Sequence, residues 1–564
     1  MNCFLSPCTT SCPIHQDIPA YLQAMEEGRP YDAFRIIVEK NALPFITGTL
    51  CPHTCADRCM RNHYEEGLHI REVKLQAAES AYDTYMSEPK RPAPKASGKK
   101  VAVIGAGPAG LASAFFLSRA GVETVVFEKR PEAGGIVKYA IPHFRIEDRK
   151  IEKDVKLCQR FGARIITGKE ITDLEQLKKD GFTDFVLATG AWKGSAPVLK
   201  EGKSMDALDF LTAVKYGQDS LNLGKDVVVI GGGNTAMDVA RAAVRQRGVR
   251  TVRLVYRRTK RYMPADEEEL RMALEDGVIF EELLAPVSLK DGMLVCSVMK
   301  LGEPDESGRR RPVDTGEKKL LPADTVITAV GERIDATLYE KLSVKLDEKG
   351  RPVVDEQLQT SRPHIYAVGD GRRGPATVVK AIADAARCAQ AIAGAHFDRY
   401  EEENAAGDEA ALLRKKGQLT AELSQQPDPR CLGCATVCEV CTDVCPNRAN
   451  IAIKVPGLKM DQILHMDGMC NECGNCAVFC PYSGRPYKDK LTLFWSKEDM
   501  DSSENQGFLV LKGTNVRLRF AGTVQEVDVA EKSDLYEPLR KFILEVIQHH
   551  SYLFAPGAGA HAES

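Results

Sequence analysis

The sequence predicts an α/β protein in which two nested dinucleotide-binding domains are flanked by two iron–sulfur domains. Two glycine-rich turns, at Gly105 and Gly231, each lie between an apolar strand-like run and an apolar helix-like run. The 18 cysteines are clustered, with six in residues 3–59 and nine in residues 431–480. Cysteines spaced this closely in a large chain are typical of metal or iron–sulfur sites rather than of disulfides. Strand-like and helix-like runs alternate between the two cysteine groups, which indicates parallel sheets covered by helices.

The composition excludes several classes of partner. The 564 residues carry 76 basic and 79 acidic side chains, so the formal charge is −3 and no basic surface for nucleic acid or an anionic membrane is indicated. No apolar run reaches the roughly 18 residues of a membrane-spanning helix. The N-terminus also lacks the basic and then apolar pattern of a secretory signal. We therefore expect a cytoplasmic protein with no nucleic-acid partner and no membrane partner.

Changes in composition predict the domain boundaries. Residues 87–99 are rich in Pro and Lys and have no apolar periodicity, so we expect a linker there. The predicted order is an α-helical N-terminal iron–sulfur domain (1–86), a FAD-binding domain (100–190 and 332–397), an NAD(P)H-binding domain (191–331), a connector (398–430), a ferredoxin-like domain (431–487) and a C-terminal tail domain of unknown role (488–564). Helical periodicity is present at 18–27, 31–40, 72–85 and 535–549, and strand-like alternation at 491–495, 507–511 and 516–520.

The first glycine-rich turn predicts the FAD site. The run GAGPAG at residues 105–110 opens a helix, and Glu128 stands at the end of the next strand. Glycines allow the backbone to approach a pyrophosphate at the helix N-terminus, and the carboxylate accepts hydrogen bonds from ribose hydroxyls. A lone glycine pattern is sometimes only a tight turn, but the strand, the helix and the acid together favour a dinucleotide site.

Two later segments point to FAD as the dinucleotide. The motifs Ala-Thr-Gly at 188–190 and Gly-Asp at 369–370 each follow a strand-like run, and both resemble the flavin disulfide-reductase superfamily. The resemblance implies that Asp370 holds the ribityl and phosphate region, and that a helix beginning near residues 375–377 directs its positive end at the flavin. A helix N-terminus there stabilises the negative charge of reduced flavin. The alternative is a strand end with an ordinary acidic cap.

The second turn, GGGNTA at residues 231–236, predicts a nicotinamide-nucleotide site. Arg257 and Arg258 stand where a ribose-binding acid would end the second strand, and a guanidinium group suits a 2′-phosphate. NADPH is therefore favoured over NADH, although an arginine pair is also a common surface feature. The residues that we assign to cofactor binding are Gly105, Ala106, Gly107, Pro108, Ala109, Glu128, Gly134, Gly135, Arg145, Ala188, Thr189, Gly190, Gly369, Asp370, Ala376, Thr377, Gly231, Gly233, Asn234, Thr235, Ala236, Arg257, Arg258 and Gly331.

The segments Tyr-Arg-Arg at 256–258 and Met-Pro-Ala at 263–265 resemble the glutamate synthase small subunit and the N-terminal half of dihydropyrimidine dehydrogenase. The resemblance covers about residues 3–395 and implies that Gly331 lies near the nicotinamide. No redox-active Cys-x4-Cys pair follows the FAD helix, so the flavin electrons are not expected to leave through a thiol pair. We expect iron–sulfur clusters to take them.

The C-terminal cysteines predict two [4Fe–4S] clusters. The run at 470–480 has the bacterial ferredoxin spacing Cys-x2-Cys-x2-Cys-x3-Cys-Pro, in which the fourth cysteine binds the other cluster. A partner run covers 434–445, and Cys431 precedes it. We assign one cluster to Cys445, Cys470, Cys473 and Cys476, and the other to Cys438, Cys441, Cys480 and either Cys434 or Cys431. Zinc is the alternative for Cys-x2-Cys pairs, but the interlocked spacing argues against it.

The N-terminal cysteines resemble the two-cluster domain of the same families. The resemblance implies two sets of ligands, each one ligand short, namely Cys3, Cys8 and Cys59 for one cluster and Cys12, Cys51 and Cys55 for the other. We expect the pattern to be completed elsewhere or by a ligand other than cysteine. The Gln or Glu ligand of the family aligns near Lys74, which as an ammonium group cannot bind iron, whereas the nearby Glu72 carboxylate can.

The order of the parts is similar to the C-terminal half of the selenate reductase flavin and iron–sulfur subunit family. This similarity continues through the ferredoxin-like run and the tail, so it spans nearly all 564 residues. It implies a connection with anaerobic purine metabolism and with molybdenum hydroxylases. Longer members of that family carry a barrel-like region in front, which we expect this chain to lack.

The expected function is that of an electron-input subunit. NAD(P)H would pass a hydride to FAD, a step that needs placement and no catalytic acid or base, and the clusters would carry electrons to a redox partner subunit. That partner would hold the terminal catalytic centre, of FMN-barrel or molybdenum hydroxylase type, and reduce a purine- or pyrimidine-like ring. One alternative is a subunit of a flavin-bifurcating NADPH:ferredoxin transhydrogenase or of a glutamate synthase-like complex. Another is an electron-bridging scaffold with degenerate nucleotide sites.

Overall fold

The described residues of the chain form two compact units. The computed structural model describes residues 5–63, 65–89, 98–194, 199–216, 221–305, 308–394, 409–416, 418–419, 429–434, 438–458, 460–530 and 535–555. The iron–sulfur unit, as we call it, takes its residues from 1–33, 53–73 and 401–564, and the dinucleotide unit takes its residues from 34–52 and 74–400. Among the described helices, none is both long enough and apolar enough to cross a bilayer.

The predicted N-terminal helices are present, but the predicted domain over 1–86 is divided between the two units. Helices α2 (Ile18–Glu26), α3 (Pro30–Lys40) and α6 (Ile70–Ser87) match the three ranges of helical periodicity to within about two residues. Short helices α1 (Pro7–Ser11), α4 (Pro44–Leu50) and α5 (Thr54–Asp57) lie between the cysteines.

The division has a physical cause at the start of α4. The buried Asp154 carboxylate, on α9 (Asp148–Gln159), accepts hydrogen bonds from the main-chain N–H groups of Phe45 at 3.1 Å and Ile46 at 2.7 Å. These N–H groups have no partner within their own helix, so the carboxylate satisfies them and also favours the positive end of the helix. The contact fixes α4 to the FAD-binding part of the chain.

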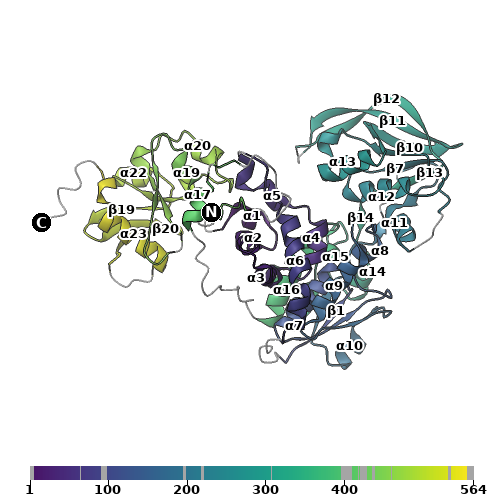
Figure 1. Ribbon diagram of the computed structural model, residues 1–564, viewed down its shortest axis with the longest axis horizontal. Coiled ribbons are helices and arrows are strands. Elements are labelled where there is room, and N and C mark those ends of the chain that lie inside the picture. Colours follow the sequence, from purple (N-terminus) through teal and green to yellow (C-terminus); the bar gives the residue numbers. More distant parts are fainter. Residues whose placement is uncertain are drawn as a thin grey trace. The chain divides into compact units, whose positions relative to one another are not determined.

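The FAD-binding part is a parallel sheet of five strands in the order β15-β4-β1-β2-β3. The strands are β1 (Lys100–Ile104), β2 (Glu123–Phe127), β3 (Arg164–Ile166), β4 (Asp184–Leu187) and β15 (Ile365–Ala367). All residues of β4 and β15 and most of β1 and β2 are buried, as expected for strands covered on both faces. Figure 1 shows α7 (Pro108–Arg119) beside α16 (Val378–Ala393), and these two helices pack against each other.

The NAD(P)H-binding part is a second parallel sheet, in the order β6-β13-β7-β8-β9. Its strands are β6 (Met205–Asp206), β7 (Asp226–Ile230), β8 (Thr251–Tyr256), β9 (Ile279–Glu282) and β13 (Thr325–Thr328). It is followed along the chain by an antiparallel sheet of β10 (Leu284–Lys290), β11 (Met293–Pro304) and β12 (Arg310–Pro322), drawn in teal in Figure 1. The α/β fold with two dinucleotide-binding sheets is therefore confirmed.

The C-terminal region is one sheet of six strands in the order β16-β17-β18-β19-β20-β21. Two of these strands, β16 (Asn450–Ile453) and β17 (Gln462–Met466), lie in the predicted ferredoxin-like domain. The other four lie in the predicted tail, namely β18 (Leu491–Leu493), β19 (Gly507–Lys512), β20 (Asn515–Phe520) and β21 (Thr523–Asp528). Leu464 of β17 pairs with Leu491 of β18 and shares one apolar core with α23 (Glu537–His549). The expected boundary between residues 487 and 488 thus cuts through a continuous sheet, and the tail is part of the ferredoxin-like domain.

Candidate functional site

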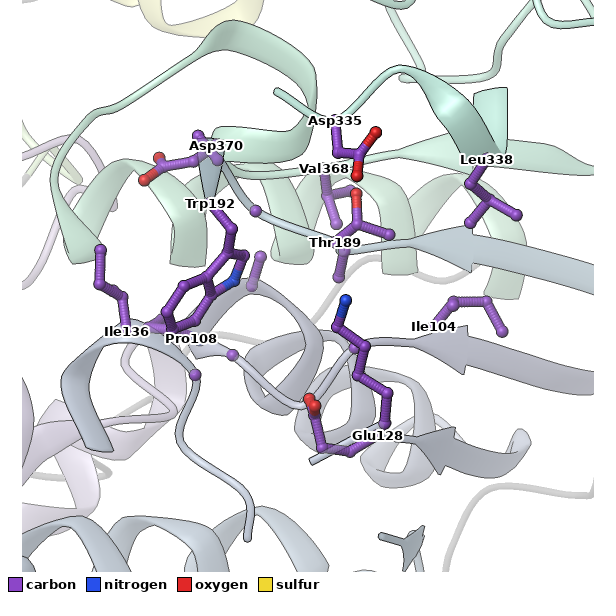
Figure 2. Close-up of a pocket in the computed structure, with 18 of the residues that line it drawn as sticks. Ile104, Pro108, Glu128, Ile136, Thr189, Trp192, Asp335, Leu338, Val368 and Asp370 are labelled. Atoms are coloured by element: carbon purple, nitrogen blue, oxygen red, sulfur yellow. The ribbon is translucent and has the colours of Figure 1, made fainter. Parts of the chain in front are cut away.

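A pocket lies at the carboxyl ends of β1, β2, β4 and β15, where parallel sheets commonly bind their ligands. Figure 2 shows Asp335, Thr189 and Leu338 across this pocket from Glu128. Many of the predicted cofactor-binding residues line it, namely Gly105, Gly107, Pro108, Ala109, Glu128, Gly135, Ala188, Thr189, Gly190, Asp370, Ala376 and Thr377. The structure thus brings together four segments that are far apart in the sequence.

The glycine-rich turn forms a cradle that no side chain would fit. Gly105 has φ +106°, and a Cβ there would lie 2.5 Å from the carbonyl oxygen of Ala188. A Cβ at Gly110 would overlap the carbonyl oxygen of Gly105. The N-terminus of α7 follows directly, so main-chain N–H groups face the space that a pyrophosphate requires. These features fit a dinucleotide.

Glu128 supports the turn from the end of β2. Its side chain is buried, and its Oε2 accepts a hydrogen bond from the Ala106 N–H at 2.7 Å. Its Oε1 accepts one from the Arg130 N–H at 2.9 Å. The carboxylate therefore lies at the turn, in the position that a ribose-binding acid takes.

Asp370 begins α15 (Asp370–Arg373) on another wall of the pocket. Burial raises the pKa of this carboxyl to about 7, although a hydrogen bond from the Ala376 main chain acts in the opposite direction. Nearby, Thr377 caps α16, because its hydroxyl accepts a hydrogen bond from the Lys380 N–H at 3.4 Å. The first turn of α16 lines the pocket, so the positive end of a 16-residue helix faces a bound cofactor.

The sequence analysis missed several residues of this pocket. Tyr339 is fully buried and donates a hydrogen bond to the carbonyl oxygen of Gly371 at 2.8 Å, while its Oη lies 3.2 Å from Thr189 Oγ1. The guanidinium of Arg130 lies 3.7 Å from the centre of the Trp192 ring, and both line the pocket. No motif marks these positions, since their role depends on tertiary packing alone.

The second glycine-rich turn joins β7 to α12 (Asn234–Val244). Gly232 lies against the ring of Tyr256, and any Cβ at this position would overlap that ring. Asn234 donates a hydrogen bond to Asp266 at 2.9 Å and accepts one from the Asp266 N–H at 3.0 Å. Thr235 donates one to Glu332 at 3.0 Å. The turn is therefore held in a fixed conformation at the N-terminus of α12.

The two arginines after β8 have different environments. Arg258 is buried, and its side chain donates hydrogen bonds to the carbonyl oxygen of Arg310 at 2.9 Å and to Asp305 at 3.3 Å. Arg257 is exposed at the end of the strand. Because the Arg258 guanidinium already has partners within the protein, we restrict the proposal for 2′-phosphate binding to Arg257.

Arg145 lies between the two dinucleotide-binding parts and away from the pocket. It forms ion pairs with Asp238 of α12 at 2.5 Å and with Glu269 at 2.6 Å. Lys215 makes a similar connection, since its ammonium donates hydrogen bonds to the carbonyl oxygens of Val137 at 3.0 Å and Ile141 at 2.5 Å. We therefore assign Arg145 a positioning role, in which it ties the two parts together.

The C-terminal cysteines line two pockets. Cys445, Cys470, Cys473 and Cys476 line one pocket together, as the ferredoxin spacing predicts for one cluster. Main-chain N–H groups of Ala449 and Glu472 donate to the sulfurs of Cys445 at 3.2 Å and Cys470 at 3.3 Å, and such bonds tune cluster potentials.

A second pocket contains Cys438, Cys441 and Cys480, together with the carboxylate residues Asp461 and Asp489. Neither Cys431 nor Cys434 is among its lining residues. These two cysteines instead line a pocket with Cys8 and Cys59. The structure therefore places both candidates for the last C-terminal ligand beside the N-terminal cysteines.

The remaining predicted metal ligands are more dispersed. Cys3 lies outside the described residues. Cys12 and Cys55 belong to the iron–sulfur unit, whereas Cys51 belongs to the dinucleotide unit. Glu72 is paired with Arg71 at 2.9 Å, and this arginine outweighs the effect of burial and lowers the pKa of the Glu72 carboxyl. Lys74 is buried in the dinucleotide unit.

Comparisons with known proteins identify the family. Residues 99–385 match the pyridine nucleotide-disulphide oxidoreductases. The chain belongs to this family. Residues 1–86 match a domain described as dihydropyrimidine dehydrogenase domain II, 4Fe-4S cluster. Together with the two cradles and the thiol-lined pockets, these matches show an NADPH-dependent flavin and iron–sulfur oxidoreductase, whose cofactors are FAD, NADPH and [4Fe–4S] clusters.

Three relatives extend the comparison. The oxidoreductase YgfK of Escherichia coli (strain K12) is 42% identical over 575 residues, which cover 98% of this chain and 56% of that protein. The NADP(+)-dependent formate dehydrogenase subunit beta of Moorella thermoacetica is 37% identical over 69% of this chain and 59% of its own length. The glutamate synthase [NADPH] small chain of Escherichia coli (strain K12) is 35% identical over 70% of this chain and 89% of its own length. The chain spans little more than half the length of the first two relatives.

Proposed function

We propose that this chain is the electron-input part of a larger oxidoreductase. It accepts reducing equivalents from NADPH at FAD and passes them through [4Fe–4S] clusters to a catalytic centre in another subunit. The observation that carries this proposal is the combination of two nucleotide cradles in one unit with three thiol-lined pockets in the other. Bound FAD supplies the step between two-electron and one-electron chemistry.

The residues of the chain position the cofactors and supply no acid or base. Glu128 and the turn at 105–110 hold the nucleotide end of FAD, while Asp370 and the N-terminus of α16 face the other side of the same pocket. Arg145 and Lys215 hold the NADPH-binding part against the FAD-binding part. Hydride transfer depends on the alignment of two rings, so rigid placement is the main contribution required from the protein.

The partner subunit would contain the terminal catalytic centre. Two of the relatives are named as a subunit beta and a small chain, which supports a partner for this chain as well. We propose a partner of FMN-barrel or molybdenum hydroxylase type and a purine- or pyrimidine-like substrate ring, in a cytoplasmic complex. The YgfK match, which covers 98% of this chain, supports a role for the C-terminal sheet in the same complex.

A second candidate is a subunit of a flavin-bifurcating NADPH:ferredoxin transhydrogenase or of a glutamate synthase-like complex. The similarity to the glutamate synthase small chain over 70% of this chain favours it. A co-purifying partner that contains its own FAD and a [2Fe–2S] cluster would support the bifurcating complex, and a partner with an amidotransferase activity would support the synthase.

Anaerobic reduction of the purified chain tests the proposal. We expect NADPH to bleach the flavin absorbance faster than NADH, and we expect about sixteen irons per chain if four clusters are present. Reduction of an added one-electron acceptor by NADPH would then show that electrons leave the flavin. A flavin that neither nucleotide bleaches would overturn the proposal and favour a scaffold.

A further inference from the structure

Four cysteines from two distant parts of the sequence line one pocket in the iron–sulfur unit. We call it the four-thiol pocket, and its cysteines are Cys8, Cys59, Cys431 and Cys434. Cys8 is on α1 and Cys59 follows α5, whereas the other two follow the connector about 370 residues later. Apolar side chains, including Leu22, Leu68 and Ile70, complete the walls.

Buried ion pairs and hydrogen bonds hold the connector beside the N-terminal cysteines. Arg61 donates hydrogen bonds to the carbonyl oxygens of Arg430 at 2.8 Å, Gln418 at 2.6 Å and Lys415 at 3.1 Å. The Glu65 carboxylate pairs with both guanidinium groups, at 3.0 Å from Arg61 and 3.4 Å from Arg430. All three charged side chains are less than 10% exposed. A buried network of this kind is stable only when each charge has partners, so it fixes the position of the segment.

A small apolar cluster reinforces the same contact. Met60, next to Cys59, packs with Leu412 of α17 (Glu409–Arg414) and with Leu432, which lies between the two connector cysteines. Cys434 packs against this cluster. Each connector cysteine is thus adjacent to an anchored residue, because Arg430 precedes Cys431 and Leu432 follows it.

The thiols themselves are in an environment that favours a bound cluster. Burial raises the pKa of Cys8 well above its ordinary value, and the neighbouring thiols Cys431, Cys55 and Cys59 raise it further. Burial likewise raises the pKa of Cys431 to about 11. Several buried thiols that repel each other's charge gain stability when a cationic cluster binds them as thiolates.

We propose that Cys8, Cys59, Cys431 and Cys434 are the four ligands of one [4Fe–4S] cluster, so that the connector completes the cluster of the N-terminal domain. The inference rests on the proposed function, in which the N-terminal domain carries clusters. Among the described residues, no group of three or more Cys, His, Asp or Glu side chains is placed to hold a single metal ion. A four-iron cluster requires its ligands further apart than one zinc ion does, so this spacing favours the cluster.

The test replaces cysteines one at a time in the full-length chain. Cys431→Ser and Cys434→Ser are each expected to lose about four irons per chain and one low-temperature EPR signal of the dithionite-reduced protein, with unchanged FAD content. Cys296→Ser, which changes a buried thiol in β11, is the matched control and is expected to keep all irons and signals. Cys470→Ser is expected to remove a different EPR signal, that of the ferredoxin-like pair. Cys3→Ser is expected to keep the cluster, since the pocket already offers four thiols.

Three outcomes would overturn the proposal. Full iron content and unchanged spectra in Cys431→Ser would exclude this ligand, and loss of a ferredoxin-like signal in Cys434→Ser would assign that thiol to the C-terminal pair. Loss of the cluster in Cys3→Ser would show that the N-terminal cysteines need no connector ligand. If the unmodified chain holds only about eight irons, the N-terminal clusters of the proposed function fail first. The two failures are therefore distinguishable.

Discussion

The Arg61 side chain donates a hydrogen bond from Nε to the main-chain oxygen of Arg430 at 2.8 Å, across 369 residues of sequence. Both residues also contact Glu65, so three buried charges join the N-terminal loop to the connector. A segment that composition alone describes as a connector is thus anchored at its C-terminal end. The anchoring leads to a first prediction.

Arg61→Ala should release the connector. Removal of one partner leaves Glu65 with one fewer buried cation, and such changes typically cost about 3–5 kcal/mol. We expect faster proteolysis within residues 409–434, measured by mass spectrometry of the fragments, and a lower thermal midpoint of the iron–sulfur unit. Lys541→Ala removes an exposed ion pair to Glu537 in the same unit and serves as the control, with little expected change. Equal protection in the two variants would contradict the anchoring role.

Gly105→Ala should abolish FAD binding. The added Cβ would lie 2.5 Å from the Ala188 carbonyl oxygen and would meet positive φ strain as well. Gly277→Ala is a matched control, since Gly277 has φ +93° but nothing within 4 Å of its Cβ. The control should lose only about 1 kcal/mol of stability from backbone strain and should retain its flavin. The measurement is the FAD to protein ratio after purification. A yellow Gly105→Ala protein with a full complement of FAD would refute the steric argument.

The stability of the FAD-free protein should fall as the pH rises from about 4 to about 7. Burial raises the folded-state pKa of Asp370 to about 7, above the ordinary value of 3.8 for an aspartate. The unfolded chain therefore releases this proton at lower pH, and the contribution of Asp370 to stability is present below pH 4 and lost as the pH rises through 7. Three pH units correspond to about 4 kcal/mol, which is an upper bound. Urea unfolding at several pH values measures the change.

The Asp370→Asn variant should reduce this pH dependence. Asp335 lines the same pocket, but hydrogen bonds from Thr337 and Lys193 lower its pKa to about 2. The contribution of Asp335 is therefore lost only as the pH falls through about 2, so Asp335→Asn should leave the slope between pH 4 and 7 unchanged. The same slope in Asp370→Asn as in the unmodified chain would rule out Asp370 as its source.

Arg257→Ala should weaken NADPH without weakening NADH. A guanidinium bound to a 2′-phosphate contributes a charge-assisted interaction that only NADPH can make, so we expect KM for NADPH to rise by about 10- to 100-fold. Steady-state kinetics with both nucleotides measure the difference. Arg258→Ala should instead lower stability, because its buried side chain bonds to Arg310 and Asp305. A parallel rise in KM for both nucleotides in Arg257→Ala would exclude a role in phosphate recognition.

The parts that were predictable from the sequence are those set by local geometry. The turn at Gly105 and the acid Glu128 lie where a strand, turn and helix must place them, because a tight turn and a parallel strand pair leave few alternatives. The same reasoning placed Cys445 with Cys470, Cys473 and Cys476, since ferredoxin spacing interlocks the two cysteine runs.

The parts that were missed depend on contacts between distant segments. Arg257 and Arg258 are adjacent in the sequence, and only packing against β12 distinguishes the buried side chain from the exposed one. Tyr339 reaches Gly371 from a helix with no motif. The boundary at 487 seemed to follow the last cysteine motif, yet β17 and β18 pair across it, because strand pairing extends beyond the metal-binding segment.

The four-thiol pocket also has a consequence for biosynthesis. Cys8 and Cys59 leave the ribosome about 370 residues before Cys431. At translation rates of about 5 to 20 residues per second, the nascent chain carries a half-built metal site for roughly 20 to 75 seconds. If the connector supplies two of the four ligands, complete loading of this cluster must wait until the whole flavin-binding region has been synthesised. Cluster insertion would then act as a late checkpoint on the maturation of the chain.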